Sequence, residues 1–219
     1  MQILPQIGKS CQIIEKRLGI SYLREKGCDY VSEISEKIAD FFVEKEVISE
    51  DDYKIYRYGA DVFIENYFMT FILIVIGGVI GKGICTITYI LTFVSVRRYS
   101  GGYHASTKAG CHIVTLGNWM LVILFVSLQQ KYHVIELWTA CIICILVYGI
   151  MYLLVPVENV KKKLLRSIRI KNRKKSLILC QVMIVFLLMF WFKLPQVSFA
   201  MLVSLIEVAL LILVGKEDK

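Results

Sequence analysis

Six long apolar segments dominate this sequence and limit what it can fold into. Segments of this length cannot stay solvated in an unfolded chain, and a bilayer with a hydrocarbon core of roughly 30 Å accommodates them. The chain as a whole is 57% hydrophobic and only 20% charged. We therefore predict an all-α, polytopic membrane protein with about six transmembrane helices, rather than a soluble domain or a disulfide scaffold. The segments span about 67–81, 84–97, 112–129, 133–155, 176–192 and 194–214.

The net charge of +8 is concentrated in one stretch of the chain. Residues 161–175 carry nine Lys or Arg residues and no acidic residue. Basic loops of membrane proteins face the cytoplasm, so this stretch is expected there, and six spans then place both termini and the 97–111 loop on the same side. A local basic loop favours membrane lipid over nucleic acid as a partner. We expect a multi-pass cell-membrane protein.

The N-terminal part of the chain has a different pattern. Up to residue 49, apolar residues recur every three or four positions, which is typical of amphipathic helices. Ser49-Glu-Asp-Asp52 then reads as the start of a helix, with a hydroxyl cap and acids in the first turn. We predict an N-terminal amphipathic helical segment over 1–49 and a transmembrane domain over 50–219.

Glycine and proline mark short connections between the apolar segments. Gly81-Lys82-Gly83 and Lys193-Leu-Pro195 predict tight turns, so that the flanking segments form hairpins. The run from Gly77 to Gly83 lacks the first glycine and the Ser or Thr of a phosphate-binding loop. We expect Gly77 and Gly81 to let helices approach closely instead.

The loop from Arg97 to Cys111 contains the residues with the clearest chemical potential. It holds one histidine, His104, and one cysteine, Cys111. Seven residues of straight helix would separate the two by roughly 10 Å of rise, so a thiol–imidazole contact requires the chain to fold back. The glycines at positions 101, 102 and 110 provide a permissive backbone for that bend.

Cys111 is expected near the N-terminus of the third span. Unpaired backbone N–H groups, the helix dipole and nearby Lys108 would favour a thiolate there, and the same N–H groups could receive an oxyanion. A His–Cys pair at this spacing is a weak signal, and the spacing alone favours two residues that only pack at the membrane boundary. His112 would point about 100° away from Cys111 on a helix, and His133 is expected at the opposite membrane face.

These residues resemble the AgrB family, membrane cysteine endopeptidases of Gram-positive quorum sensing. Arg97 is followed by Gly-Gly-x-His104, and Cys111 comes seven residues later. Pro156-Val-Glu before Lys161-Lys-Lys and the segment Tyr58-Gly-Ala-Asp61 are also similar to the family, which often has Glu at the position of Asp61. The resemblance covers roughly residues 34–219, and we expect residues 1–33 to be an extension.

The resemblance implies an enzyme that binds a short precursor peptide of the AgrD type at the cytoplasmic face. Cys111 would be the nucleophile and His104 the general base and later acid. The cleaved peptide would remain as a thioester until an internal thiol or hydroxyl displaces it to form a thiolactone or lactone. Arg97, Gly102 and Asp61 would be the substrate-binding residues, and no metal or cofactor is implied.

Two other classes remain compatible with the sequence. A non-enzymatic peptide transporter or membrane binding module would use the same loop merely to grip a peptide, and the membrane-sensor part of a signalling protein is a further alternative. The sequence also leaves open whether the chain forms a homodimer.

Overall fold

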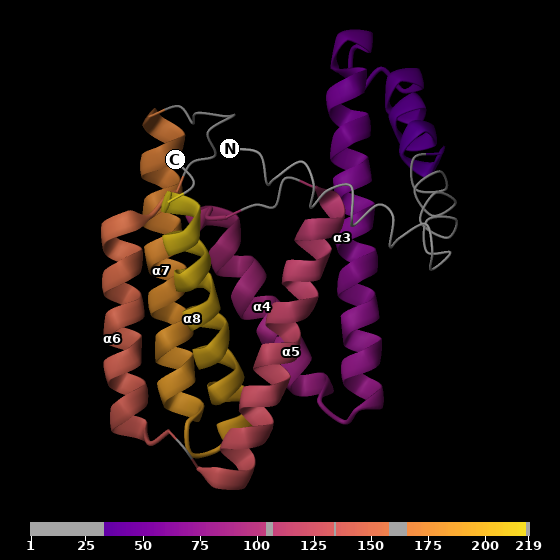
Figure 1. The fold of residues 1–219 in the computed structure, drawn as a ribbon. Helices are drawn as coiled ribbons and strands as arrows, with labels where there is room; N and C mark the ends of the chain where they lie inside the picture. Colours follow the sequence, from indigo (N-terminus) through magenta and orange to yellow (C-terminus); the bar gives the residue numbers. More distant parts are fainter. Residues whose placement is uncertain (1–32, 104–106, 134, 158–165, 218–219) are drawn as a thin grey trace, which may run out of the picture. The chain divides into compact units, whose positions relative to one another are not determined.

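The structure is a computed structural model that describes residues 33–103, 107–133, 135–157 and 166–217. Most of the described chain is helical (Figure 1). It divides into two compact units, Met1–Thr70 and Phe71–Lys219, with the boundary inside one helix. A helix over 33–44 precedes η1 (Glu50–Asp52), α3 (Tyr53–Val79), α4 (Gly83–Ser100), α5 (Lys108–Tyr132), α6 (Leu137–Leu154), α7 (Arg166–Phe190) and α8 (Pro195–Glu217).

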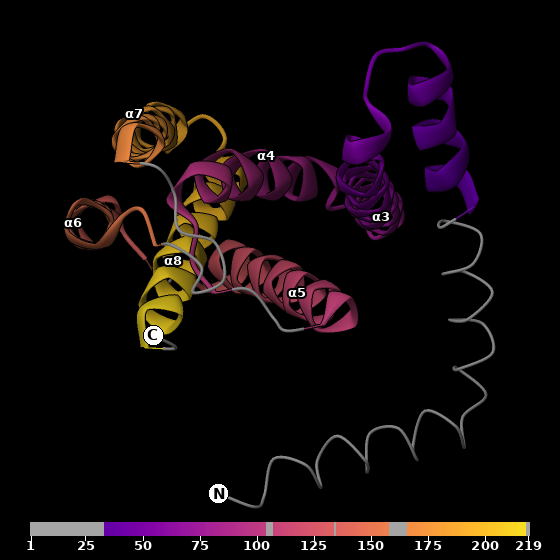
Figure 2. The same ribbon diagram turned by 90° about the horizontal axis from the view of Figure 1, so that it is seen from above.

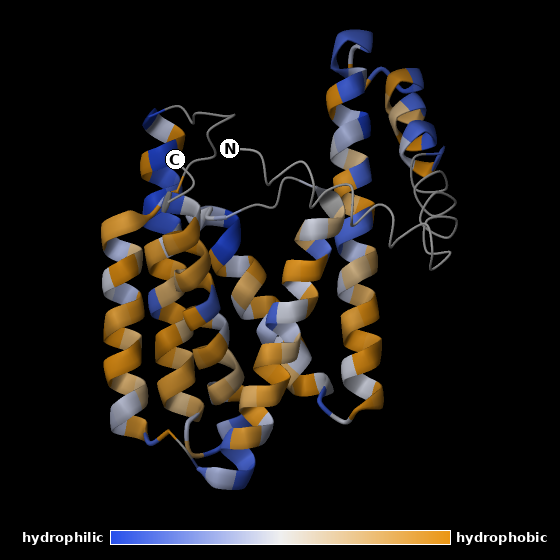
Figure 3. Ribbon diagram, in the orientation of Figure 1, coloured by the Kyte–Doolittle hydropathy of each residue, from blue (hydrophilic) through white to orange (hydrophobic). Residues whose placement is uncertain are grey.

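The predicted all-α membrane architecture is confirmed. Each of the six apolar segments falls largely within one of the helices α3 to α8, and hydrophobic residues cover these helices along most of their length (Figure 3). Four of the described helices are long and apolar enough to cross a membrane: Glu50–Val79, Ala109–Tyr132, Leu137–Leu154 and Pro195–Lys216. The number of passes and the cytoplasmic position of the termini stay predictions.

The first unit contains the helix over 33–44 and the beginning of α3. Arg57 and Glu36 form an ion pair at 2.5 Å, and the rings of Phe42 and Tyr56 lie 6.4 Å apart, so the two helices are in contact. The predicted helix start at Ser49 is confirmed, since η1 and α3 follow it directly. However, its hydroxyl does not cap a backbone N–H, because it donates to the Asp52 carboxylate at 3.0 Å.

The second unit is built around α8. In the 18-residue apolar stretch of α8, 67% of the residues are buried, whereas the corresponding share is 22% or less in the other three candidate spans. We therefore identify α8 as the core helix of this unit. It contacts α4, α5, α6 and α7, and Figure 2 shows it among them. Burial on all sides explains why α8 is apolar around its whole circumference rather than along one stripe.

The turns of the second unit follow the glycine and proline positions. Lys82 bonds back to Gly77, and Leu194 bonds back to Phe190 at 2.8 Å, so both predicted tight turns are confirmed. Gly77 does allow a close helix contact, because a Cβ there would lie 2.8 Å from the Thr86 Cβ. The same expectation for Gly81 is wrong. Gly81 lies in the turn itself, where its φ of 71° needs glycine, and a Cβ there would meet nothing.

Candidate active site

Cys111 lies in the first turn of α5 and is half-buried. Thr107 caps the helix: its hydroxyl accepts a hydrogen bond from the Gly110 N–H at 3.1 Å, and its carbonyl accepts one from the Cys111 N–H at 3.1 Å. The capped start at Thr107 sets where α5 begins and hence where the thiol stands. The predicted position of Cys111 near the N-terminus of this span is confirmed.

The same capping bonds restrict which amides are available in the first turn. The N–H groups of Gly110 and Cys111 are both occupied by Thr107, so an oxyanion there would have to use the earlier amides of Lys108 and Ala109. The expected bend at Gly110 is wrong, because Gly110 is an ordinary helical residue. Among the described residues of this connection, the bend lies at positions 101 and 102.

The chain leaves α4 through two glycines with positive φ. Gly101 has a φ of 71° and Gly102 a φ of 118°, both in the region that favours glycine. Because α4 continues to Ser100 and α5 begins at Lys108, the connection is shorter than the 97–111 loop expected from sequence. His104 lies outside the described residues, so its approach to Cys111 stays a prediction.

The start of this connection is held on two sides by backbone contacts. Gly101 pairs with Val157 in a parallel bridge, in which the Val157 N–H donates to the Ser100 carbonyl at 2.9 Å. On the other side, the Tyr103 N–H donates to the Leu211 carbonyl of α8 at 2.8 Å. The residue that directly precedes His104 is therefore attached to the core helix.

Gly215, in the last turn of α8, leaves space for this contact between the loop and the helix. A Cβ at Gly215 would lie 2.6 Å from the Gly102 carbonyl carbon, a separation that real Cβ atoms do not adopt. A Cβ at Gly102 would in turn lie 3.0 Å from the Leu211 carbonyl oxygen. Both glycines thus allow the loop and the helix to touch backbone to backbone.

Arg97 links the end of α4 to the same loop. Its Nη2 donates to the Tyr103 carbonyl, and its guanidinium stacks on the Phe93 ring at 5.3 Å. Its Nη1 is buried and has no hydrogen-bond partner, while the Cys111 sulfur is close enough to interact electrostatically with the guanidinium. Arg97 therefore keeps one free hydrogen-bond donor, its Nη1.

The substrate-binding roles expected of Arg97 and Asp61 stay predictions. Asp61 belongs to the first unit and Arg97 to the second, and the two units are described separately. The Oδ1 of Asp61 is buried and makes no hydrogen bond. A carboxylate oxygen without a partner retains the capacity to accept a hydrogen bond.

A hydrogen-bonded chain connects Cys111 with the core. The Thr115 hydroxyl donates to the Cys111 carbonyl at 3.0 Å, and the Tyr89 hydroxyl donates to the Thr115 carbonyl at 3.4 Å. Tyr89 is 1% exposed and interacts electrostatically with Glu207. Glu207 on α8 is buried, and neither of its carboxylate oxygens has a hydrogen-bond partner.

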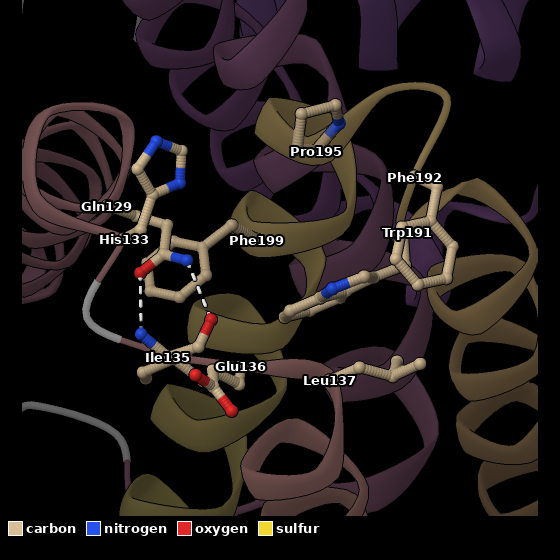
Figure 4. Close-up of a pocket in the computed structure, with 9 residues that line it drawn as sticks. All are labelled: Gln129, His133, Ile135, Glu136, Leu137, Trp191, Phe192, Pro195 and Phe199. Carbon is tan, nitrogen blue, oxygen red and sulfur yellow. Dashed lines mark hydrogen bonds between the residues drawn. The ribbon is translucent and has the colours of Figure 1, made fainter.

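The opposite end of α5 carries a separate pocket of about 400 Å³. Figure 4 shows it lined by aromatic side chains, with the Gln129 amide held by two hydrogen bonds to the backbone of Ile135. His133 ends α5 here, which confirms that it lies far from Cys111. With 1.5 Å of rise per residue, the two are about 33 Å apart along the helix. This pocket cannot serve a reaction at Cys111.

Sequence reasoning missed the residues that fix the loop. These are Thr107, Tyr103, Leu211 and Gly215. A threonine three residues before a glycine that opens an apolar run is a recognisable cap signal, and Gly215 interrupts an otherwise apolar segment. The backbone contacts at Tyr103 and Leu211 have no signal in side-chain chemistry.

Comparison with known proteins identifies the family. The family model described as Accessory gene regulator B matches residues 35–214. An AgrB-like protein of Listeria innocua is 30% identical over 90 residues, which is 40% of this chain and 44% of the relative. The accessory gene regulator protein B of Staphylococcus lugdunensis is 28% identical over 136 residues, which is 61% of this chain and 69% of the relative.

The match to the Listeria relative spans less than half of its length, whereas the family model covers most of this chain. No solved structure matches the chain. The matched region contains α3 to α7 and most of α8, including Arg97, Cys111 and the loop between them. This chain, a helical membrane protein, therefore belongs to the accessory gene regulator B (AgrB) family.

Proposed function

We propose that this protein is a membrane cysteine endopeptidase that processes an AgrD-like precursor peptide. The observation that carries the proposal is the placement of Cys111: a half-buried thiol in the first turn of α5, within electrostatic reach of the half-buried Arg97. A helix N-terminus and a nearby cation both stabilise a thiolate, which is the reactive form of cysteine.

His104 is the proposed general base. It follows Tyr103, whose N–H is bonded to α8 and whose carbonyl is bonded to Arg97. A base used in catalysis must be held in place by its surroundings, and this double attachment fixes the chain immediately before the imidazole. The fixed loop supports a catalytic role better than a purely boundary-packing one.

The reaction proceeds by two acyl transfers. The Cys111 thiolate attacks the scissile carbonyl carbon, the C–N bond breaks, and the imidazolium of His104 gives its proton to the departing amine. The N-terminal part of the peptide remains as a thioester on Cys111. A thiol or hydroxyl within that peptide then attacks the thioester carbonyl and loses its proton to the imidazole. The C–S bond breaks and releases Cys111 as a thiolate beside the regenerated imidazolium.

Ring formation requires that water does not reach the thioester first. Exchange of one thioester for another keeps the acyl group activated, so the cyclisation needs exclusion of competing water rather than a further driving force. The half-buried position of Cys111 at the end of a membrane-crossing helix supports that exclusion. We place this end of α5 at the cytoplasmic face, with both termini on the same side.

The three predicted substrate residues have different roles in this proposal. Arg97 offers its unpaired Nη1 to a carbonyl or carboxylate of the peptide. Gly102 acts through the backbone, because it lets the loop lie against α8 at Leu211. Asp61 offers an unpartnered carboxylate oxygen from the first unit.

Co-expression with the precursor peptide tests the proposal. Cys111→Ala and His104→Ala should each remain in the membrane fraction and lose precursor cleavage by about 10³-fold or more, the scale seen when a nucleophile or its base is removed. Cys141→Ala on α6 and His133→Asn at the far end of α5 are matched controls that should cleave normally. Continued cleavage by Cys111→Ala would favour a transporter or a peptide-binding module.

A further inference from the structure

A groove between α4 and α7 combines two cations with an apolar floor. It has a volume of about 480 Å³, in the range of ligand sites in proteins. Cys111, which lies on α5, is not among its lining residues. The lining residues are Val94, Ser95, Arg98, Tyr99, Lys175, Ile178 and Leu179.

The two cations of this groove, here called the α4–α7 groove, share one aromatic ring. The Lys175 ammonium lies 5.0 Å from the centroid of Tyr99, and the Arg98 guanidinium lies 5.9 Å from it. Neither cation pairs with a carboxylate in the described chain, and the sequences of α4 and α7 contain no acidic residue. The groove therefore presents two positive charges without a counter-charge from its own walls.

The apolar residues lie one helical turn deeper than the cations on both walls. On α4, Val94 precedes Arg98 by four positions; on α7, Ile178 and Leu179 follow Lys175 by three and four. Residues at these spacings lie above one another on one helix face. Both helices pack along the core helix α8, itself a candidate membrane span, so the deeper residues lie toward the bilayer interior.

We infer that the α4–α7 groove binds an anionic phospholipid. The phosphate contacts Arg98 and Lys175, and an acyl chain lies along Val94, Ile178 and Leu179. A zwitterionic lipid fits the apolar part but brings a cation toward the two that are present, and a soluble phosphate leaves the apolar wall exposed. A cationic rim above an apolar wall at a membrane interface matches the chemistry of an anionic lipid alone.

Lipid retention by the purified full-length protein tests this inference without any peptidase assay. Phosphatidylglycerol and phosphatidylcholine with identical chains are offered in mixed micelles, and bound lipid is counted by native mass spectrometry. Wild type should retain phosphatidylglycerol at least about fivefold better than phosphatidylcholine, since one cation near an anionic surface contributes about a factor of five. Arg98→Gln with Lys175→Gln should reduce that retention about 25-fold.

The matched control changes the same number of charges outside the groove, both of them on α7. Lys171→Gln with Lys174→Gln, both exposed on α7, should bind like wild type, and Lys175→Arg should retain the lipid and so separate charge loss from misfolding. Equal retention of the two lipids, or an equal loss in the Lys171 and Lys174 control, overturns the inference. Displacement of the lipid by inorganic phosphate or by a Glu-rich peptide at equal concentration also overturns it.

Discussion

Replacing Gly215 by alanine probes whether contact with α8 positions the catalytic loop. Alanine favours a helix over glycine by about 1 kcal/mol, so α8 itself should gain stability. The added Cβ would nevertheless lie 2.6 Å from the Gly102 carbonyl carbon, where ordinary contacts begin at 3.4 Å. The loop must therefore move by about 1 Å, a displacement that can reduce a reaction rate about 100-fold.

The assay is precursor cleavage by the reconstituted protein, together with thermal unfolding in the same detergent. We expect kcat/KM of Gly215→Ala to fall by about 100-fold while the unfolding midpoint stays at or above that of wild type. Gly149→Ala on α6 is the matched control, because a Cβ there meets nothing within 4 Å. A Gly215→Ala protein that cleaves at the wild-type rate would refute the positioning role of α8.

Three further substitutions test packing and capping. Gly77→Ala should lower stability by about 1–3 kcal/mol in thermal unfolding because its Cβ overlaps α4, whereas Gly78→Ala, which meets nothing, should not. Thr107→Ala removes the hydrogen bond to the Gly110 N–H, so it should lower the free energy of unfolding by about 1 kcal/mol and speed amide hydrogen exchange in the first turn of α5. Thr107→Ser keeps a hydroxyl and should leave that exchange as slow as in wild type. Glu207→Gln should unfold at the same or a higher temperature, because the buried carboxylate has no hydrogen bond to lose, and a clear decrease would contradict this.

The helical membrane fold was predictable because segment length and hydrophobicity act locally. A long apolar run has few alternatives to a membrane helix, and the turns at Gly81-Lys82-Gly83 and Lys193-Leu-Pro195 follow from backbone preference. The central position of α8 was not predicted. Four helices pack around it, but every apolar segment presents similar hydrophobicity, so sequence alone does not rank their burial.

The chemical groups of the candidate site were predictable from the sequence, whereas the contacts that hold its loop in place were less so. Cys111 stands at a helix start, and Gly101 and Gly102 form the bend, because both features follow from residue type. The bond from Tyr103 to Leu211 joins backbone atoms more than 100 positions apart in the sequence. Such a contact depends on the packing of α8 against the loop, which no local pattern encodes.

Intact-mass analysis of the protein during turnover tests the central claim most directly. Rapid acid quenching of the reconstituted protein with its precursor peptide should reveal an adduct equal in mass to the N-terminal part of the peptide. The adduct should map to Cys111, be released by hydroxylamine as a thioester is, and be absent from Cys111→Ala. Cleavage that proceeds without an adduct, or an adduct on another cysteine such as Cys141, would contradict the account.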